Sequence, residues 1–204
     1  MTTTDLPQSL PIFPLTGALL LPHAQLPLNI FEPRYVEMVD DALREHRMVG
    51  MVQTHPCAEG CRLYDVGCAG RIISFEEAED GRYLITLLGL SRFRIQEELK
   101  CNSLYRRVVP DWKEFSRDLE STCCFGFKKD DFFQVLKAYF QQQGIEMHWD
   151  ILYEAPDEKI ISALSMICPF EPNEKQALLE APCCEARGEI LKAMLEIEIH
   201  KKTI

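Results

Sequence analysis

Prolines interrupt an apolar stretch near the N-terminus, and this pattern limits what that stretch can form. Between Leu10 and Tyr35 the chain contains Pro11, Pro14, Pro22, Pro27 and Pro33. Proline has no backbone N–H to donate within a sheet, so strands that contain it are expected at sheet edges or at bulges. Glu32 and Pro33 indicate a helix start, because proline suits the first helical position. We predict short strands at residues 9–13, 19–21 and 26–28, and a helix at 33–46.

The stretch that follows predicts an antiparallel sheet. Val66–Phe75 and Arg82–Leu90 are typical of a hairpin, with Gly81 in the turn between them. Many short strands before residue 112 favour a small barrel, because closing a sheet removes its exposed edges. The further strands are expected at residues 48–53, 91–98 and 104–112.

From residue 130 onward the apolar residues recur at the helical spacing. Residues 130–142 form the first such segment, and Gly144 follows it as a suitable C-terminal cap. Further helices are expected after three prolines, because proline favours the first turn of a helix. These prolines are Pro156, Pro172 and Pro182, and the helices cover residues 157–166, 173–180 and 184–200.

The predicted fold class is therefore α+β. A β-rich, barrel-like lobe with one helix is expected over residues 1–112, and a helical bundle lobe over residues 130–204. Residues 113–129 lack a clear period, and we interpret them as the connection between the lobes. A chain of 204 residues is long enough to bury a sizeable core in this arrangement.

Several blocks of the sequence resemble the N-terminal, substrate-binding domain of Lon proteases. The signature residues of the first block are Pro27, Asn29, Phe31, Glu32, Pro33, Arg34 and Tyr35. Similar blocks follow in the family's order at residues 63–72, 80–87, 92–95 and 166–181. The resemblance covers residues 8–200 and implies a PUA-like barrel in the β-rich lobe. It also implies a stand-alone, bacterial-type module that recognises proteins and lacks the ATPase and protease domains of Lon.

Charge and composition disfavour several classes of partner. The formal net charge is −10, whereas proteins that bind phosphate backbones need clustered lysine and arginine. No apolar run approaches the ~20 residues of a membrane span, and residues 1–7 lack the features of a secretory signal. We therefore expect a cytoplasmic protein with no nucleic-acid or membrane partner. Most of its nine cysteines are expected to be reduced.

Common catalytic motifs are missing from the sequence. It has no G-x-x-x-x-G-K-[ST] loop for ATP, no H-E-x-x-H pair for a metalloprotease and no G-x-S-x-G elbow. We therefore predict a protein that is not an enzyme and that carries no cofactor. Arg71, Arg92 and Arg94 are expected to pair with surface glutamates, which contributes little to stability.

One group of residues has the composition of a metal site. His55, Cys57, Cys61 and Cys68 together offer one imidazole and three thiols, a donor set that zinc accepts. Their spacing departs from that of zinc fingers, and Cys68 lies in a predicted strand where an inward position is expected. We favour a metal-free loop followed by a core cysteine.

Apolar side chains supply the candidate binding site. Residues 130–142 carry more aromatic side chains than one buried stripe requires, so we expect an apolar groove between the lobes. Its predicted lining is Leu19, Leu21, Phe132, Phe133, Tyr139 and Phe140. The signature block is instead expected to be structural, with Phe31 packed as a staple against Tyr35 at the helix start.

Two functions of different class follow from these observations. The resemblance favours recognition of unfolded or extended protein segments, or of one specific protein partner, by a non-catalytic module such as a quality-control adaptor. The alternative is binding of a small molecule or a nucleic acid through the PUA-like barrel. The acidic net charge disfavours RNA. The sequence assigns no oligomeric state.

Overall fold

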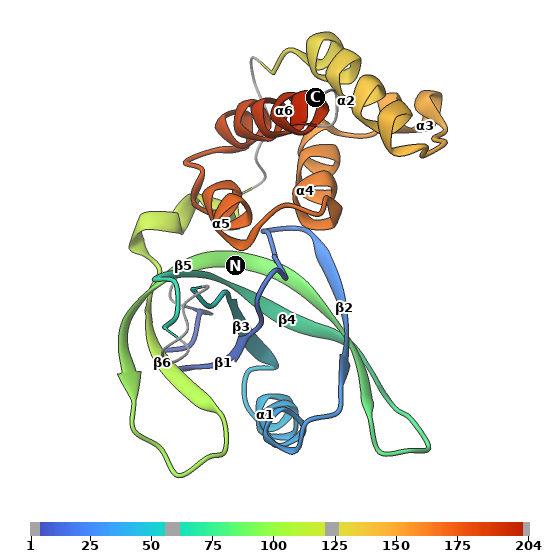
Figure 1. Ribbon diagram of the computed structural model, residues 1–204. Helices are drawn as coiled ribbons and strands as arrows, with labels where there is room; N and C mark the ends of the chain where they lie inside the picture. The colour runs from blue at the N-terminus through green and yellow to red at the C-terminus, as the bar shows by residue number, and fades with distance from the viewer. Residues whose placement is uncertain (1–4, 56–61, 121–126, 202–204) are drawn as a thin grey trace.

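The computed structural model describes residues 5–55, 62–120 and 127–201 (Figure 1). The first part is a six-stranded sheet with one helix, and the second part is a group of helices at one end of that sheet. The predicted α+β class is confirmed. The last strand ends at Asp111 and the first long helix of the second part begins at Lys129. The domain boundaries at 112 and 130 stay predictions.

The strands pair in a closed circuit. They are β1 (Leu10–Pro14), β2 (Gln25–Ile30), β3 (Met48–Val52), β4 (Val66–Glu77), β5 (Tyr83–Leu99) and β6 (Arg106–Asp111). Their order is β2-β5-β4-β3-β1-β6, and β6 pairs with β5 as well as with β1. Pairing therefore runs from β5 through β4, β3, β1 and β6 back to β5, as a barrel requires. The PUA-like relationship stays a prediction.

The hairpin predicted around Gly81 is confirmed, but its second strand is longer than expected. β5 continues to Leu99, so the separate strand expected at 91–98 is wrong. The first half of β5 pairs with β2 and the second half with β6. A register shift against β4, between Ala69 and Gly70, lies where β5 changes partners. A bulge of this kind lets one strand bend between two neighbours without ending.

The proline-containing strands differ in position. β2, which contains Pro27, pairs only with β5 and is an edge strand, as predicted. β1 lies between β3 and β6, so the edge position expected for it is wrong. It accommodates Pro11 and Pro14 because residues 10–12 pair with β6, whereas residues 12–14 pair with β3. Each proline therefore lies in a part of β1 that pairs with one neighbouring strand and not with two. Residues 19–21 form no strand, contrary to the prediction.

Helix α1 (Pro33–Arg44) begins at Pro33 and buries the predicted face, which includes Tyr35 and Met38. The residues before it differ from the prediction. Ile30 is 1% exposed, whereas Phe31 is 65% exposed. The expectation that Phe31 is a buried staple is therefore wrong. Neighbouring side chains of an extended segment point to opposite faces, and Ile30 takes the core side.

The second part contains the predicted helices. They are α2 (Lys129–Gln143), α3 (Trp149–Glu154), α4 (Asp157–Ile167), α5 (Pro172–Glu180) and α6 (Cys184–Lys201), preceded by the 3-10 helix η2 (Lys113–Leu119). Gly144 ends α2 at φ 69°, in the left-handed region that favours glycine. Helix α6 contacts α2, α4 and α5, and α5 contacts β4. The helical part therefore joins the sheet part through α5.

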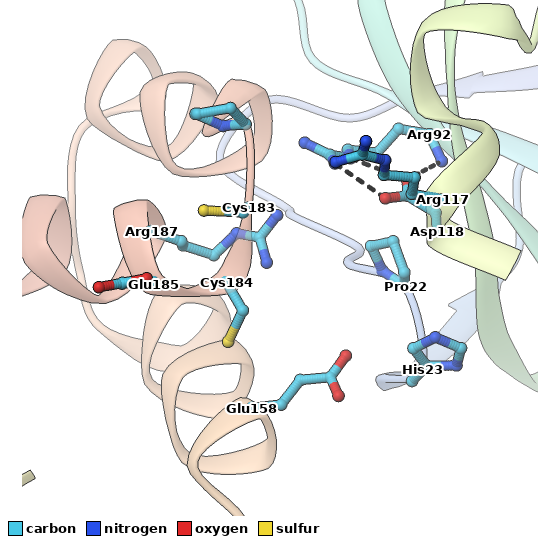
Figure 2. Close-up of a pocket in the computed structure, with 11 residues that line it drawn as sticks. Pro22, His23, Arg92, Arg117, Asp118, Glu158, Cys183, Cys184, Glu185 and Arg187 are labelled. Carbon is cyan, nitrogen blue, oxygen red and sulfur yellow. Dashed lines mark hydrogen bonds and ion pairs between the residues drawn. The ribbon is translucent and has the colours of Figure 1, made fainter. Parts of the chain in front are cut away.

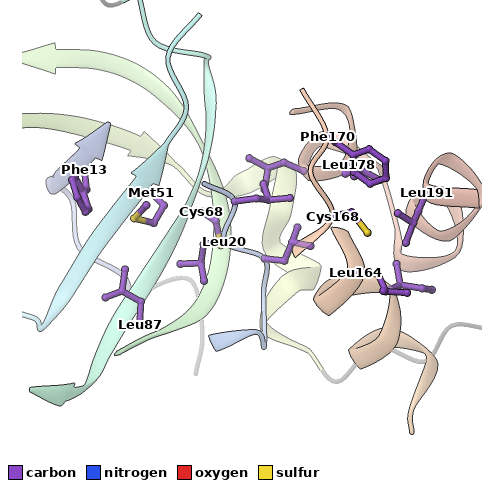
Figure 3. Close-up of a cluster of buried hydrophobic side chains, with 14 of the residues drawn as sticks. Phe13, Leu20, Met51, Cys68, Leu87, Leu164, Cys168, Phe170, Leu178 and Leu191 are labelled. Carbon is purple, nitrogen blue, oxygen red and sulfur yellow. The ribbon is translucent and has the colours of Figure 1, made fainter. Parts of the chain in front are cut away.

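One apolar core runs through both parts (Figure 3). Leu20 and Cys68 belong to the sheet part, and Leu164, Leu178 and Leu191 belong to the helices, yet all lie in the same buried cluster. Its members are 8% exposed or less. Burial of apolar surface between the parts therefore stabilises both of them.

A network of buried hydrogen bonds also connects the helical part to the sheet part. Gln53 Nε2 donates to Gln176 Oε1 at 3.1 Å, and Gln176 Nε2 donates to the Val66 carbonyl oxygen at 3.1 Å. Lys175 Nζ donates to the Gly17 carbonyl oxygen at 2.8 Å. These bonds link α5 to the sheet part at three places. Because buried polar groups are costly to leave unpaired, they favour this one docking geometry.

Candidate functional site

A groove runs between the turn before β2 and helix α4; we call it the interlobe groove. Its apolar half encloses about 430 Å³. Pro22 and Ala24 line it from the sheet part, and Ala163, Met166 and Ile167 line it from the helical part. The Ile167 side chain is 69% exposed, so a large apolar surface faces solvent at the rim. An exposed apolar patch with polar surroundings is typical of an interaction site.

Gly89 of β5 holds the sheet-side wall of the groove in place. The His23 N–H donates to the Gly89 carbonyl oxygen at 2.9 Å, and the Gly89 N–H donates to the Ala24 carbonyl oxygen at 2.8 Å. A Cβ at position 89 would lie 2.0 Å from the Leu21 carbonyl oxygen. Only glycine permits so close an approach. Residues 21–24 therefore lie directly against β5.

The polar half of the interlobe groove encloses about 290 Å³ and shares Pro22, His23 and Glu158 with the apolar half. Figure 2 shows the Glu158 carboxylate facing this cavity, whereas the Glu185 side chain points away from it. Arg117 also lines the cavity and is exposed. The groove thus continues from an apolar surface into a charged one.

A buried ion pair forms one wall of the polar half. Arg92 Nη2 lies 2.8 Å from Asp118 Oδ1, and Arg92 Nε donates to Asp118 Oδ2 at 2.8 Å. Arg92 Nη1 donates to the carbonyl oxygens of Leu179, at 2.9 Å, and Ala181, at 2.6 Å. The guanidinium also lies 4.5 Å from the centre of the Phe115 ring. Arg92 therefore joins β5, η2 and the end of α5.

The surface role expected for Arg92 is therefore wrong. Its side chain is 5% exposed, and its carboxylate partner comes from η2 and not from a neighbouring strand. Arg94, two residues further along β5, forms a surface pair with a glutamate as expected, but this glutamate also comes from η2: Arg94 Nη2 lies 2.9 Å from Glu114 Oε2, and both side chains are about half exposed.

Arg187 of α6 is a buried cation in the polar half. It is 5% exposed, and Nε donates to the Leu178 carbonyl oxygen at 2.8 Å. Among the described residues its Nη1 and Nη2 atoms have no hydrogen-bond partner and form no ion pair. Figure 2 shows the guanidinium directed into the cavity. Burial, together with the nearby Arg92 charge, lowers the pKa of Arg187 to about 10, which leaves it charged at neutral pH.

Ser162 of α4 is a second incompletely bonded group, in the apolar half. The residue is 4% exposed and lines the groove. Its hydroxyl oxygen is buried and has no hydrogen-bond partner in the described part of the chain. A hydroxyl can donate and accept, so it suits the N–H or the C=O of an extended backbone.

The lining predicted from the sequence lies elsewhere. Its six residues are 4% exposed or less and belong to the core cluster, so the prediction of an open groove with these side chains is wrong. They are Leu19, Leu21, Phe132, Phe133, Tyr139 and Phe140. The aromatic side chains of α2 are buried because α6, α3 and neighbouring segments cover more than one face of that helix. A groove between the lobes does exist, but α4 forms it.

The signature residues gather at the junction of β2 and α1, at the end of the sheet part away from the helices (Figure 1). Pro27 and Asn29 pair with Thr86 and Leu84 of β5, respectively. Glu32 and Pro33 form the start of α1. Arg34 Nη2 lies 2.7 Å from Glu32 Oε2, and the Tyr35 ring packs against Phe13 with 4.3 Å between the ring centres. Their roles stay predictions.

The candidate metal ligands are described only in part. Cys57 and Cys61 lie outside the described residues. His55 stacks against Tyr64 with 3.8 Å between the ring centres, and Cys68 is buried, as expected. Burial raises the pKa of the Cys68 thiol well above its usual range, which disfavours a thiolate. Among the described residues no group of three or more potential ligands comes together.

Cys184 is disulfide-bonded and is therefore not one of the cysteines expected to be reduced. Cys68, Cys101, Cys168 and Cys183 are free.

Sequence reasoning missed Ser162, Ile167 and Arg187. One signal was present: Ile160, Ile161 and Leu164 form the buried stripe of α4, which leaves Ala163 and Ile167, four residues apart, on another face. An apolar residue outside the buried stripe indicates a second contact surface. Nothing local marks Arg187, because its burial depends on the docking of α6 beside α5.

Comparisons with known proteins agree on one family. The ATP-dependent protease La (LON) substrate-binding domain matches residues 9–196. Lon protease 1 of Herpetosiphon aurantiacus is 24% identical over an alignment of 207 positions that covers 97% of this chain and 25% of that protein. Lon protease 2 of Sorangium cellulosum is 32% identical over an alignment of 118 positions that covers 55% of this chain and 15% of that protein. The chain therefore spans a quarter or less of these relatives.

Two solved structures share the fold. A Lon N-terminal domain protein from Xanthomonas campestris superposes with a TM-score of 0.65 at 23% identity, covering 91% of this chain and 97% of that one. The N-terminal domain of Mycobacterium avium complex Lon protease gives a TM-score of 0.68 at 16% identity, covering 92% and 98%. In the described part of the chain, no helix is both long and apolar enough to span a bilayer.

Proposed function

Because this chain belongs to the Lon substrate-binding domain family, we propose that it recognises extended segments of unfolded proteins in the interlobe groove and does not itself cleave them. The observation that carries the proposal is the exposed apolar surface of α4, where Ile167 is 69% exposed beside Ala163 and Met166. An apolar side chain of a bound segment would cover this surface and lose its own contact with water.

Ser162 supports an extended occupant. Ser162 lines the apolar half, and its buried hydroxyl oxygen has no hydrogen-bond partner among the described residues. A backbone group that bonds there would satisfy a buried oxygen that otherwise lacks a partner. Side-chain contact with Ile167 and backbone contact with Ser162 would together select for apolar composition and an extended shape, with little dependence on exact sequence. This is the selectivity that a quality-control adaptor needs.

Fluorescence anisotropy of a labelled apolar peptide tests the proposal. Ile167→Asp places a charge on the apolar wall, and Ala163→Trp fills the groove; we expect each to weaken binding at least about tenfold, equivalent to about 1.4 kcal/mol. Leu104→Asp is the matched control, because Leu104 is 66% exposed in the loop between β5 and β6 and lies outside the groove.

Equal binding by all four proteins would show that the groove is not the site. Mass spectrometry of the peptide after incubation with ATP and magnesium tests the non-catalytic part of the proposal. Cleavage that persists through further purification would contradict it.

A further inference from the structure

The geometry points to a second recognition element in the interlobe groove: we propose that Arg187 and Arg117 bind the carboxylate of an Asp or Glu side chain in the segment whose apolar residue contacts Ile167. This inference rests on the proposed function and specifies which segments the groove selects. The polar and apolar halves share Pro22, His23 and Glu158, so one extended segment can occupy both.

Arg187 is the main element of this site. The residue is 5% exposed, yet among the described residues only its Nε has a hydrogen-bond partner. The Nη1 and Nη2 groups carry four further N–H donors, and Figure 2 shows this end of the side chain directed into the cavity. A buried charge without a bonded counter-ion is costly, and a ligand carboxylate would relieve that cost.

The charge balance of the cavity favours a monoanion. Asp118 is already bonded to Arg92 through both of its oxygens, so this pair contributes little net charge. Glu185 is also a lining residue, but its carboxylate is turned away from the Arg187 guanidinium. Arg187 and Arg117 therefore share one facing carboxylate, that of Glu158, which leaves one of the two positive charges without a facing carboxylate. One carboxylate balances it, whereas a phosphate dianion would add a second negative charge beside Glu158.

The shape of the ligand group follows from arginine chemistry. A guanidinium presents its N–H groups as a planar fork that matches the two oxygens of a carboxylate. The proposed occupants are internal segments of unfolded chains, so the carboxylate is that of a side chain and not of a chain end. A cavity of about 290 Å³ has room for a side chain of this size.

Four labelled peptides test the inference by fluorescence anisotropy. Three of them share one apolar segment, which is followed by a single test residue. The first has Glu at this position and an amidated C-terminus. The second has Gln and an amidated C-terminus, and the third has Gln and a free C-terminal carboxylate. The fourth replaces the apolar residues by Ser and keeps the Glu. We expect the Glu peptide to bind about tenfold more tightly than either Gln peptide, and the Ser peptide to bind weakly.

Variants assign the effect to the two arginines. Arg117→Gln and Arg187→Met should each remove the preference for the Glu peptide over the amidated Gln peptide. Arg44→Gln, an exposed arginine of α1, is the control and should keep the preference. Arg117 is exposed, so Arg117→Gln remains informative if Arg187→Met does not fold.

The outcomes separate the two proposals. Equal binding of the Glu and Gln peptides, or a preference unaffected by Arg117→Gln, would overturn the carboxylate site while leaving the apolar groove intact. A preference only for the free C-terminus would overturn the assignment to a side chain. Failure of every apolar peptide to bind would overturn both proposals.

Discussion

Arg92 and Asp118 form a buried, doubly hydrogen-bonded ion pair, although β5 and η2 bring them from different segments of the chain. The same arginine donates to two carbonyl oxygens at the end of α5. A single side chain thus connects the sheet, the linking 3-10 helix and the helical part beside the candidate groove.

We expect Arg92→Met to lower the free energy of unfolding by about 3–5 kcal/mol, because it leaves the Asp118 charge buried without its partner. Asp118→Asn should have a smaller effect in the same direction, since an amide can still accept a hydrogen bond. Urea denaturation followed by circular dichroism measures both. Arg94→Gln is the control: its pair with Glu114 is exposed, so its loss should cost less than about 1 kcal/mol. Equal effects of Arg92→Met and Arg94→Gln would contradict the assigned role.

Truncating the two apolar residues before α1 should change the stability of the protein by very different amounts. Ile30→Ala removes a side chain that is 1% exposed and should cost about 2–5 kcal/mol of stability. Phe31→Ala removes one that is 65% exposed and should change stability by less than about 0.5 kcal/mol. Thermal melts of the two variants provide the comparison. A large loss of stability in Phe31→Ala alone would mean that Phe31 is covered in solution.

Gly89→Ala should displace residues 21–24, because the added Cβ would meet the Leu21 carbonyl oxygen. We expect a stability loss of about 1–3 kcal/mol together with weaker binding of the apolar peptide. Gly70→Ala is the matched control, since its Cβ would meet the side chains of Leu20 and Leu87 away from the groove wall. Gly70→Ala should lower the stability of the protein, but the folded fraction of this variant should bind the apolar peptide as tightly as the wild type does.

Thiol reactivity should follow burial. Burial raises the pKa of Cys168 to about 11, so very little of it is thiolate at roughly pH 8 and its alkylation should keep accelerating as the pH rises toward that value. Cys183 is free and exposed and should react much faster at the same pH. Iodoacetamide labelling, followed by mass spectrometry of the peptides at several pH values, separates the two sites. Denaturation should abolish the difference; equal rates in the folded protein would refute it.

Local patterns predicted most of the elements because short-range rules govern them. Pro33 in the first turn of α1 and Gly144 after α2 limit the backbone by themselves, and both helices lie where these residues indicate. The continuation of β5 beyond Gly89 was not predictable in this way. It depends on a bulge against β4 and on a change of pairing partner, which involve residues far apart in the sequence.

The candidate site was harder to predict than the fold for the same reason. The rings of Phe132 and Phe133 indicated an apolar surface correctly, but whether another helix covers it depends on tertiary packing. Arg92 and Arg94 stand two residues apart and point to the same face of a strand, yet one is buried and the other is exposed. Both pair with a carboxylate of η2, and only Arg92 also donates to carbonyl oxygens at the end of α5, which no local pattern predicts.

The core that passes from Leu20 and Cys68 to Leu164 and Leu178 has a consequence for how the protein unfolds. Neither part can lose its packing without exposing apolar surface of the other, so melting should be a single cooperative transition and not two successive ones. The groove should therefore keep its shape as long as the rest of the fold does, and a bound chain meets the same surface until the whole fold is lost.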